Sequence, residues 1–322
     1  MKHTELLREM IAAFENELAQ YRAGNRADYC YQQAHDETYG NTDAHSFSRA
    51  RLCYALCFCK TVPEPEREQI IRALFAEKIT ANENESFQGI SSGLKILTCL
   101  LLPYRRPEDD ALFARAKQAN FDCACGYDPT LYEYPDDPAC YSLEDCTDVA
   151  ADTDMQDYLC RFIDHVKAQE PDADTCRHWQ YYAGMTGRAE DKVYFTERIF
   201  ALTARNAEAE PIKRLIAYEN YIQYLAESGD AESAYALFTE GMPFLVSANK
   251  TALYRTAESI MEADAAMIPQ VWQDIRTNTL QWLANGTLYP VCFSLAAKCA
   301  ALAGDSKTVR LLEKAEKKWK DH

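Results

Sequence analysis

The stretch YENYIQYLAESGDAESAYALFTEG, residues 218–241, decides how we expect this chain to fold. Its apolar residues fall three or four positions apart, which is the spacing of one face of an α-helix. The first half carries Tyr218, Tyr221, Ile222 and Leu225, and the second half carries Ala234 and Phe238. Gly229-Asp230 interrupts the pattern between the halves. The stretch therefore predicts two helices joined by a short turn.

Helical spacing also dominates the rest of the chain. It recurs over residues 7–21 and 155–166, and Pro211 stands where a helix accepts a proline in its first turn. Thr153-Asp154-Met155-Gln156 has the pattern of a capping box, so we expect Thr153 to begin a helix. We find no convincing run of alternating β-branched residues. These patterns predict an all-α protein.

Turn signals recur along the chain at a nearly constant interval. They lie near residues 24, 62, 103, 187, 229, 265 and 304. Neighbouring signals are about 40 residues apart, and one interval is twice that length. Such a period is typical of an α-α superhelix of stacked helix hairpins, in which each hairpin buries its apolar face against the next. The alternative is a compact bundle with evenly spaced loops.

The residues that carry this pattern resemble a tetratricopeptide repeat. Residues 218–241 have aromatic and apolar positions on the first helix, a Gly-Asp turn, and a small residue and an aromatic on the second. Residues 303–315 are similar, and residues 184–202 are a poorer copy. The spacing is irregular and the usual closing proline is missing. The resemblance implies a divergent array that holds a peptide or partner protein and performs no chemistry.

The pattern divides the chain into three segments. We expect N-terminal helical repeats over residues 1–117, an irregular acidic insertion rich in Tyr, Cys and Pro over 118–152, and C-terminal repeats over 153–322. The first and third segments are expected to form one continuous array.

The acidic charge is concentrated in one part of the sequence. The 322 residues include 50 Asp plus Glu and 34 Lys plus Arg, for a formal net charge of −16. Residues 118–160 contain eleven of those acids and no Lys, Arg or His. This balance argues against nucleic acid as a partner, because phosphate binding needs clustered Lys and Arg. It favours a basic protein or peptide.

The acidic insertion supplies our candidate partner-binding residues. Its carboxylates alternate with tyrosines, which suits Arg and Lys through charge pairing and cation–π contacts. The candidates are Asp122, Tyr127, Asp128, Tyr132, Glu133, Tyr134, Asp136, Asp137, Tyr141, Glu144 and Asp145. The prolines between them forbid a regular helix, so we expect a long ordered loop. The alternative is a solvated linker.

Four cysteines in or beside the loop are weak candidates for a metal site. Cys123, Cys125, Cys140 and Cys146 could together hold a tetrahedral zinc ion. However, zinc ribbons have two residues between the cysteines of each pair, whereas these pairs have one and five. We therefore expect no metal and no cofactor.

A serine motif is the other possible sign of catalysis. Gly89-Ile90-Ser91-Ser92-Gly93 matches the nucleophile elbow of a hydrolase, which works at a strand-to-helix turn. No strand pattern precedes Ser91, so a helix start made of small residues is the stronger interpretation. His35 and His45 lie in another polar stretch, where surface histidines are the common outcome.

The sequence also bears on the compartment. The first residues contain no uninterrupted apolar run typical of a secretory signal, and the most apolar stretch, residues 96–102, is too short to span a bilayer. The 13 cysteines are an odd number, and several occupy apolar positions as thiols would. We expect a cytoplasmic protein with no membrane contact.

Together these features predict a non-catalytic helical-repeat protein that binds a basic protein or peptide. One alternative is an immunity-type inhibitor of a basic toxin domain, by charge complementarity. Another is a thiol- or zinc-dependent hydrolase. The sequence predicts no oligomeric state.

Overall fold

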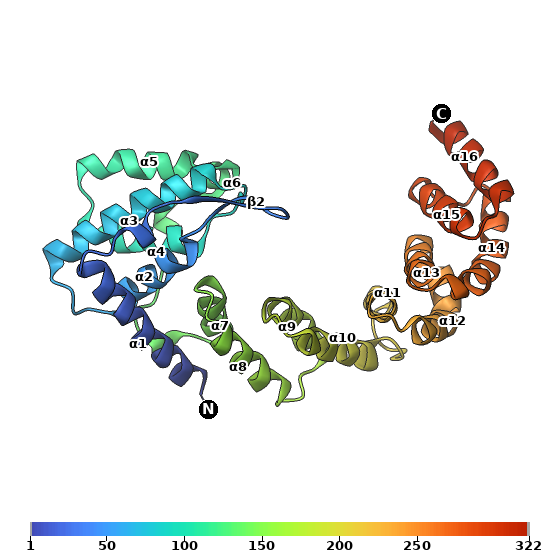
Figure 1. Ribbon diagram of the computed structural model, residues 1–322, viewed down its shortest axis with the longest axis horizontal. Helices are drawn as coiled ribbons and strands as arrows, with labels where there is room; N and C mark the ends of the chain where they lie inside the picture. Colours follow the sequence, from blue (N-terminus) through green and yellow to red (C-terminus); the bar gives the residue numbers. More distant parts are fainter. Residues whose placement is uncertain (1, 321–322) are drawn as a thin grey trace. The chain divides into compact units, whose positions relative to one another are not determined.

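The computed structural model describes residues 2–320, and it confirms that the chain is almost entirely helical (Figure 1). Over that range it contains sixteen α-helices, six short 3₁₀ turns and one pair of short strands. The chain forms two compact units, of which the first ends at Ala168 and the second begins at Gln169. No helix within residues 2–320 is long and apolar enough to cross a membrane.

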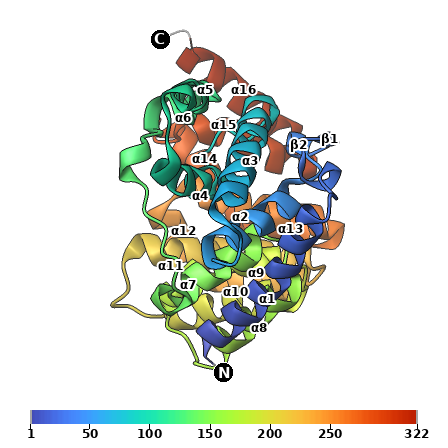
Figure 2. The same ribbon diagram turned by 90° about the vertical axis from the view of Figure 1, so that its left-hand side faces the viewer.

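The first unit contains eight helices and the strand pair, and Figure 2 shows it from the front. The helices are α1 (His3–Arg22), α2 (Ser46–Phe58), α3 (Glu64–Asn84), α4 (Ser92–Leu101), α5 (Asp110–Gln118), α6 (Phe121–Gly126), α7 (Leu143–Asp152) and α8 (Gln156–Lys167). The strands are β1 (Gln33–Asp36) and β2 (Gly40–Asp43). The 3₁₀ turns are η1 (Ala27–Tyr29), η2 (Leu102–Tyr104), η3 (Pro107–Asp109), η4 (Pro129–Leu131) and η5 (Pro138–Cys140).

Helix α2 forms the centre of the first unit. It packs against α1, α3 and α4, and every residue from Leu52 to Cys57 is buried. A helix that is apolar on all sides is stable only where other elements cover it. The position of α2 therefore follows from its composition.

The strand pair differs from the sequence prediction, which contained no strand. β1 and β2 pair antiparallel, with Gln33 opposite Asp43 and Asp36 opposite Gly40. The Asp36 carboxylate accepts the N–H groups of Thr38 and Tyr39, at 2.8 and 2.9 Å, and so closes the turn between the strands. These strands are short and polar, so the alternation that signals a half-buried strand is missing.

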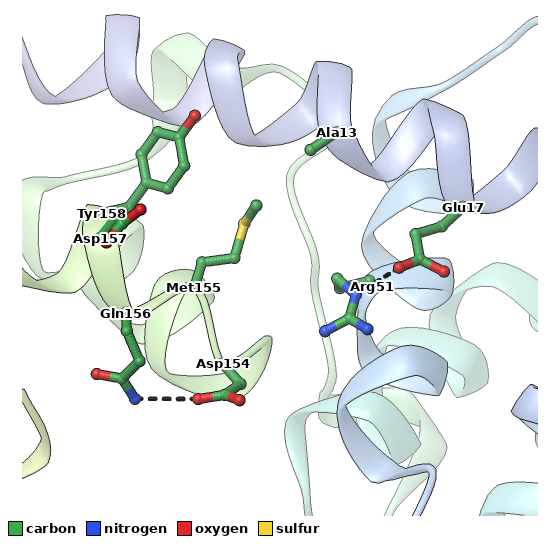
Figure 3. A pocket seen from close by; sticks show the side chains of 8 residues that line it. All are labelled: Ala13, Glu17, Arg51, Asp154, Met155, Gln156, Asp157 and Tyr158. Carbon is green, nitrogen blue, oxygen red and sulfur yellow. Dashed lines mark hydrogen bonds and ion pairs between the residues drawn. The ribbon is translucent and has the colours of Figure 1, made fainter.

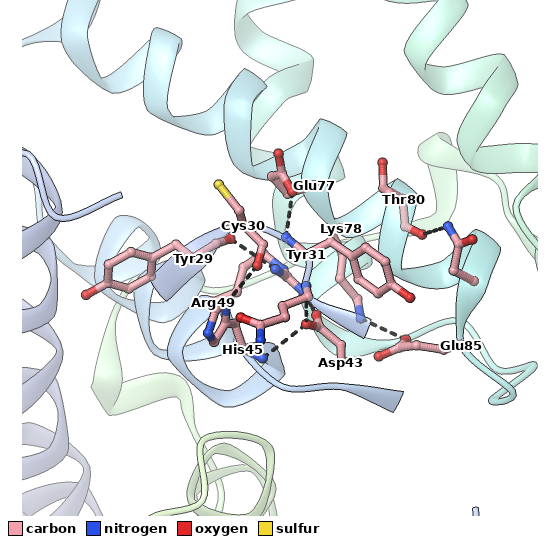
Figure 4. A network of polar contacts seen from close by, with 12 residues as sticks. Tyr29, Cys30, Tyr31, Asp43, His45, Arg49, Glu77, Lys78, Thr80 and Glu85 are labelled. Carbon is pink, nitrogen blue, oxygen red and sulfur yellow. Dashed lines mark hydrogen bonds and ion pairs between the residues drawn. The ribbon is translucent and has the colours of Figure 1, made fainter. Parts of the chain in front are cut away.

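A buried ion pair fixes this hairpin to α2 (Figure 4). Arg49 of α2 pairs with Asp43 of β2, and both side chains are almost fully buried. Arg49 also donates to the carbonyl oxygen of Tyr29 at 3.0 Å, and Asp43 accepts the N–H of His45 at 3.0 Å. The hairpin thus depends on contacts that are distant in sequence.

Replacing Arg49 with Met leaves the Asp43 charge buried without its partner. We expect a loss of about 3–5 kcal/mol in the unfolding free energy of the first unit, and partial recovery when Asp43→Asn is added. Urea unfolding followed by far-UV circular dichroism measures the loss. All four tryptophans lie after residue 168, so their fluorescence serves as an internal control and should not change. Equal stability of Arg49→Met and wild type would contradict this role.

The second unit consists of consecutive helix pairs. The helices are α9 (Ala173–Met185), α10 (Ala189–Thr203), α11 (Pro211–Glu227), α12 (Ala231–Ala248), α13 (Lys250–Ala263), α14 (Ile268–Ala284), α15 (Pro290–Leu302) and α16 (Ser306–Lys320), with the turn η6 (Ala265–Met267). Each odd-numbered helix packs against the one that follows it, and α13 also packs against both α11 and α15. The turns expected near residues 187, 229, 265 and 304 each lie between the two helices of a pair.

Residues 218–241 form the end of α11, a short turn and most of α12, as the sequence predicts. Ala234 and Phe238 are fully buried. Helices α11 and α12 also approach each other closely at Gly241, where a methyl group would stand 2.8 Å from the Tyr218 ring. Gly229 has a φ of +85° and supplies the left-handed residue that ends α11.

The predicted capping box at Thr153 is wrong. Thr153 follows the last residue of α7, and its hydroxyl donates back to the carbonyl oxygen of Val149 at 2.6 Å. Asp154 takes a φ of +54°, which is the left-handed position after a helix end. Helix α8 begins at Gln156 without a side-chain cap. The residues that resemble the start of a helix therefore stand at the end of α7.

An ion pair at the start of α16 gives the second unit a pH dependence. Arg276 donates to Asp305 at 2.8 Å, and Thr308 donates to it through its N–H and its hydroxyl. The guanidinium lowers the pKa of Asp305, so its stabilising effect is present above the unfolded-state pKa and is lost as the pH falls.

Replacing Asp305 with Asn keeps an acceptor for the helix start but removes the charge. We expect a loss of about 1 kcal/mol at pH 7, because Arg276 is partly exposed, and a smaller loss below about pH 4. Urea unfolding followed by tryptophan fluorescence at both pH values measures the difference. A loss that does not change with pH would show that the ion pair contributes nothing.

Candidate functional site

The irregular part of the acidic segment is a strap, which we define as residues 127–142 between α6 and α7 (Figure 2). Two of its prolines, Pro129 and Pro138, begin the 3₁₀ turns η4 and η5. Helices α6 and α7 lie within residues 118–152 on either side of the strap. The segment expected to be irregular is therefore partly helical, and all of it belongs to the first unit.

The strap is attached to the helices beneath it. The Tyr127 hydroxyl shares a 2.8 Å hydrogen bond with Thr98 of α4, and Lys117 of α5 donates to the Tyr127 carbonyl oxygen at 2.9 Å. Within the strap, the Tyr141 hydroxyl donates to the carbonyl oxygen of Pro135 at 3.0 Å. These contacts describe an ordered surface rather than a solvated linker.

The tyrosines of the strap point inward. Tyr127 and Tyr141 are buried, and Tyr132 and Tyr134 are partly buried. Burial raises the pKa of Tyr127 and of Tyr134 to about 12. The expectation that all four rings face a partner is revised, because buried rings hold the strap in place instead.

The carboxylates of the segment mostly point outward. Asp122, Glu133, Asp136, Asp137, Glu144 and Asp145 are exposed. Several have a local role: Asp136 pairs with Lys60, while Asp128 and Asp137 accept N–H groups of Thr130 and Ala139, each at 2.9 Å. These acids therefore shape the turns as well as the surface.

One cavity of about 220 Å³, which we call the strap cavity, lies between the strap, α7 and the helices α2 and α4. Its lining consists of Tyr54, Ser92, Glu133, Tyr134, Pro135, Tyr141, Asp145, Asp148 and Val149. Four of the predicted residues, Glu133, Tyr134, Tyr141 and Asp145, therefore line one space. Asp122, Tyr127, Asp128, Tyr132, Asp136, Asp137 and Glu144 lie outside the lining.

A partly buried hydrogen bond supports the wall of this cavity. The Tyr54 hydroxyl of α2 donates to Asp152 of α7 at 2.9 Å, and Tyr134 interacts with both Tyr54 and Ser92. Burial raises the pKa of Asp152. The sequence analysis missed Tyr54 and Ser92, because Tyr54 stands in an apolar helix and Ser92 belongs to a motif interpreted as a helix start.

Replacing Tyr54 with Phe removes the donor to Asp152 and preserves the ring. We expect the first unit to lose about 1–2 kcal/mol at pH 7, because a partly buried carboxylate then has one hydrogen bond fewer. The loss should shrink at acid pH as Asp152 gains a proton and accepts more weakly. Circular dichroism during urea unfolding at pH 7 and 4.5 provides the comparison, and an equal loss at both would rule out the charged hydrogen bond.

The four candidate metal-ligand cysteines do not meet. Cys123 and Cys146 are buried, whereas Cys125 and Cys140 are exposed. Residues 2–320 contain no group of three or more His, Cys, Asp or Glu side chains arranged to hold a metal ion. Burial raises the pKa of the Cys146 thiol to about 12, which disfavours the thiolate that a metal or a nucleophilic reaction needs.

Ser91 stands at the start of a helix. Its hydroxyl oxygen accepts the N–H of Leu94 at 3.4 Å, as an N-cap residue does. Helix α3 ends at Asn84, and residues 85–91 contain no strand. The strand-to-helix turn of a nucleophile elbow is therefore missing from this part of the chain.

A second cavity of about 430 Å³ lies between α1, α2, the turn after α7 and the start of α8 (Figure 3). It is lined by Ala13, Glu17, Arg51, Asp154, Met155, Gln156, Asp157 and Tyr158. Arg51 donates to Glu17 at 2.7 Å and to the Thr153 carbonyl oxygen at 2.9 Å. This cavity contains charges of both signs, so its electrostatics select no single class of ligand.

Comparisons with protein-family models, with curated proteins and with solved structures gave no match.

Proposed function

We propose that this protein is a non-catalytic binding protein that captures a basic protein or peptide on the acidic surface around the strap. The observation that carries the proposal is the strap cavity, which is lined by Glu133, Asp145 and Asp148 and, among the described residues, by no basic side chain. A cavity of this charge favours a cationic group. The surrounding exposed carboxylates extend the same potential over the strap.

The helix pairs of the second unit support a repeat architecture for this function. We propose that they form a divergent tetratricopeptide-like superhelix with a period of about 40 residues. The packing of α13 against α11 and α15, and the close approach of Gly241 to Tyr218, fit that arrangement. Repeats of this kind stack against their neighbours and present an extended surface to a partner.

We propose a cytoplasmic location, since the thirteen cysteines, all within residues 2–320, are thiols rather than disulfides, and a reducing compartment maintains that state. A specific version of the proposed function is an immunity-type inhibitor. Its basic partner would be a toxin domain that it neutralises by charge complementarity.

The test removes charge from the proposed surface at three exposed positions, one of which, Glu133, also lines the strap cavity. The variant carries Asp122→Asn, Glu133→Gln and Asp137→Asn, and the probe is fluorescein-labelled hexalysine. We expect roughly tenfold weaker binding than wild type at low salt, and a smaller difference at 0.5 M salt, because screening weakens exposed charge pairs. Fluorescence anisotropy gives both dissociation constants.

A matched variant controls for net charge. Glu190→Gln, Glu227→Gln and Glu232→Gln remove the same charge from exposed positions of the second unit. Binding by this variant should stay close to that of wild type. If both variants weaken capture equally, the whole-chain charge attracts the peptide and the strap is not the binding surface.

A further inference from the structure

We infer that the strap cavity receives one arginine side chain of the basic partner, and that it prefers this guanidinium group to a lysine ammonium group. The inference rests on the proposed function and adds the identity of the partner side chain that enters the cavity. It follows from the chemistry, the placement and the size of the cavity.

The chemistry of the lining calls for a ligand that donates hydrogen bonds. The carboxylates of Glu133, Asp145 and Asp148 can only accept hydrogen bonds when ionised. The hydroxyls of Tyr54 and Tyr141 already donate, to Asp152 and to the Pro135 carbonyl oxygen, so neither offers a donor to a ligand. Arg and Lys are the side chains that carry a positive charge and donors alone.

The placement of the acceptors distinguishes Arg from Lys. Glu133 belongs to the strap, while Asp145 and Asp148 lie three residues apart on α7 and therefore share a helix face. A guanidinium group has five donors in a planar fork and can bond to acceptors from separate elements at once. An ammonium group is a compact charge with three donors. Of the tyrosine rings in the lining, that of Tyr134 is partly exposed and adds a surface on which a guanidinium stacks.

One of the acceptors, Asp145, is held in position before a ligand arrives. Asp145 accepts the N–H of Ser142 at 2.8 Å and its hydroxyl at 2.6 Å, which fixes the carboxylate at the start of α7. An ionised carboxylate offers about four lone-pair sites, so Asp145 retains capacity for another donor. Preorganised acceptors reduce the entropy lost on binding.

The size of the cavity indicates a single side chain. Its volume of about 220 Å³ is below the range of roughly 300–1,000 Å³ that is usual for small-molecule sites. It corresponds to about seven water molecules at about 30 Å³ each. The second cavity is larger, but Arg51 in its lining would repel a guanidinium group.

The experiment compares hexa-arginine with hexalysine, two labelled probes of equal charge, on the full chain at 150 mM salt. The cavity variant carries Glu133→Gln and Asp148→Asn. The control carries Asp122→Asn and Asp137→Asn, which lie outside the lining and remove the same charge. Circular dichroism first verifies that each variant is folded, and fluorescence anisotropy then gives the two dissociation constants for each protein.

We expect wild type to bind hexa-arginine at least about fivefold more tightly than hexalysine, because several acceptors engage one planar group. The cavity variant should lose this preference, whereas the control should weaken both peptides equally and keep the ratio.

Two results would overturn the inference and leave the proposed function in place. One is equal affinity of wild type for the two peptides, and the other is a preference for hexa-arginine that survives in the cavity variant. Failure of both peptides to bind wild type even at low salt would overturn the proposed function itself.

Discussion

The polar contacts of the buried helix α2 are the constraint on which the first unit depends. Arg49 holds the hairpin through Asp43, Arg51 joins Glu17 of α1 to the end of α7, and Tyr54 donates to Asp152. The Arg49–Asp43 pair is buried and the other contacts are partly buried, so losing one partner costs more than the bond itself contributes, most of all at Arg49. Because these three residues lie within two turns of α2, the hairpin, α1 and α7 are all positioned by one helix. The wall of the strap cavity follows directly from that arrangement.

In the acidic strap, tyrosines and carboxylates alternate along the sequence but take different places in the structure. Its tyrosines have large apolar rings and one polar atom each, so they can be buried and still make a hydrogen bond, as Tyr127 does with Thr98. Its carboxylates cannot be buried without a partner and stay at the surface. An alternating Tyr and Asp/Glu sequence that lacks helix periodicity therefore folds with rings inward and charges outward. The cavity forms where Tyr134 and Tyr141 meet Glu133 and the acids of α7.

Sequence analysis predicted the features that depend on local signals. The helices around Gly229 follow from apolar spacing, and the turn follows from a glycine that accepts a positive φ. The hairpin could not be predicted, because polar strands are stabilised by the Arg49 contact and not by their own pattern. Tyr54 and Asp152 are 98 residues apart, and no motif links them. At Thr153 the local signal gave a wrong prediction of a helix start, because the same residue types also occur at the end of a helix.

Charge is distributed unequally between the two units, and this bears on where a basic partner would bind. The chain has 29 acidic and 17 basic residues up to Ala168, but 21 and 17 after it. In the second unit, acids on neighbouring helices are engaged with bases, as in the pairs Glu219–Arg255 and Glu258–Lys298. Such pairs leave little net field at a distance, whereas unbalanced carboxylates attract cations over about one Debye length. The basic partner that we propose would therefore be drawn first to the unit that carries the strap, and the strap cavity would then select among its side chains.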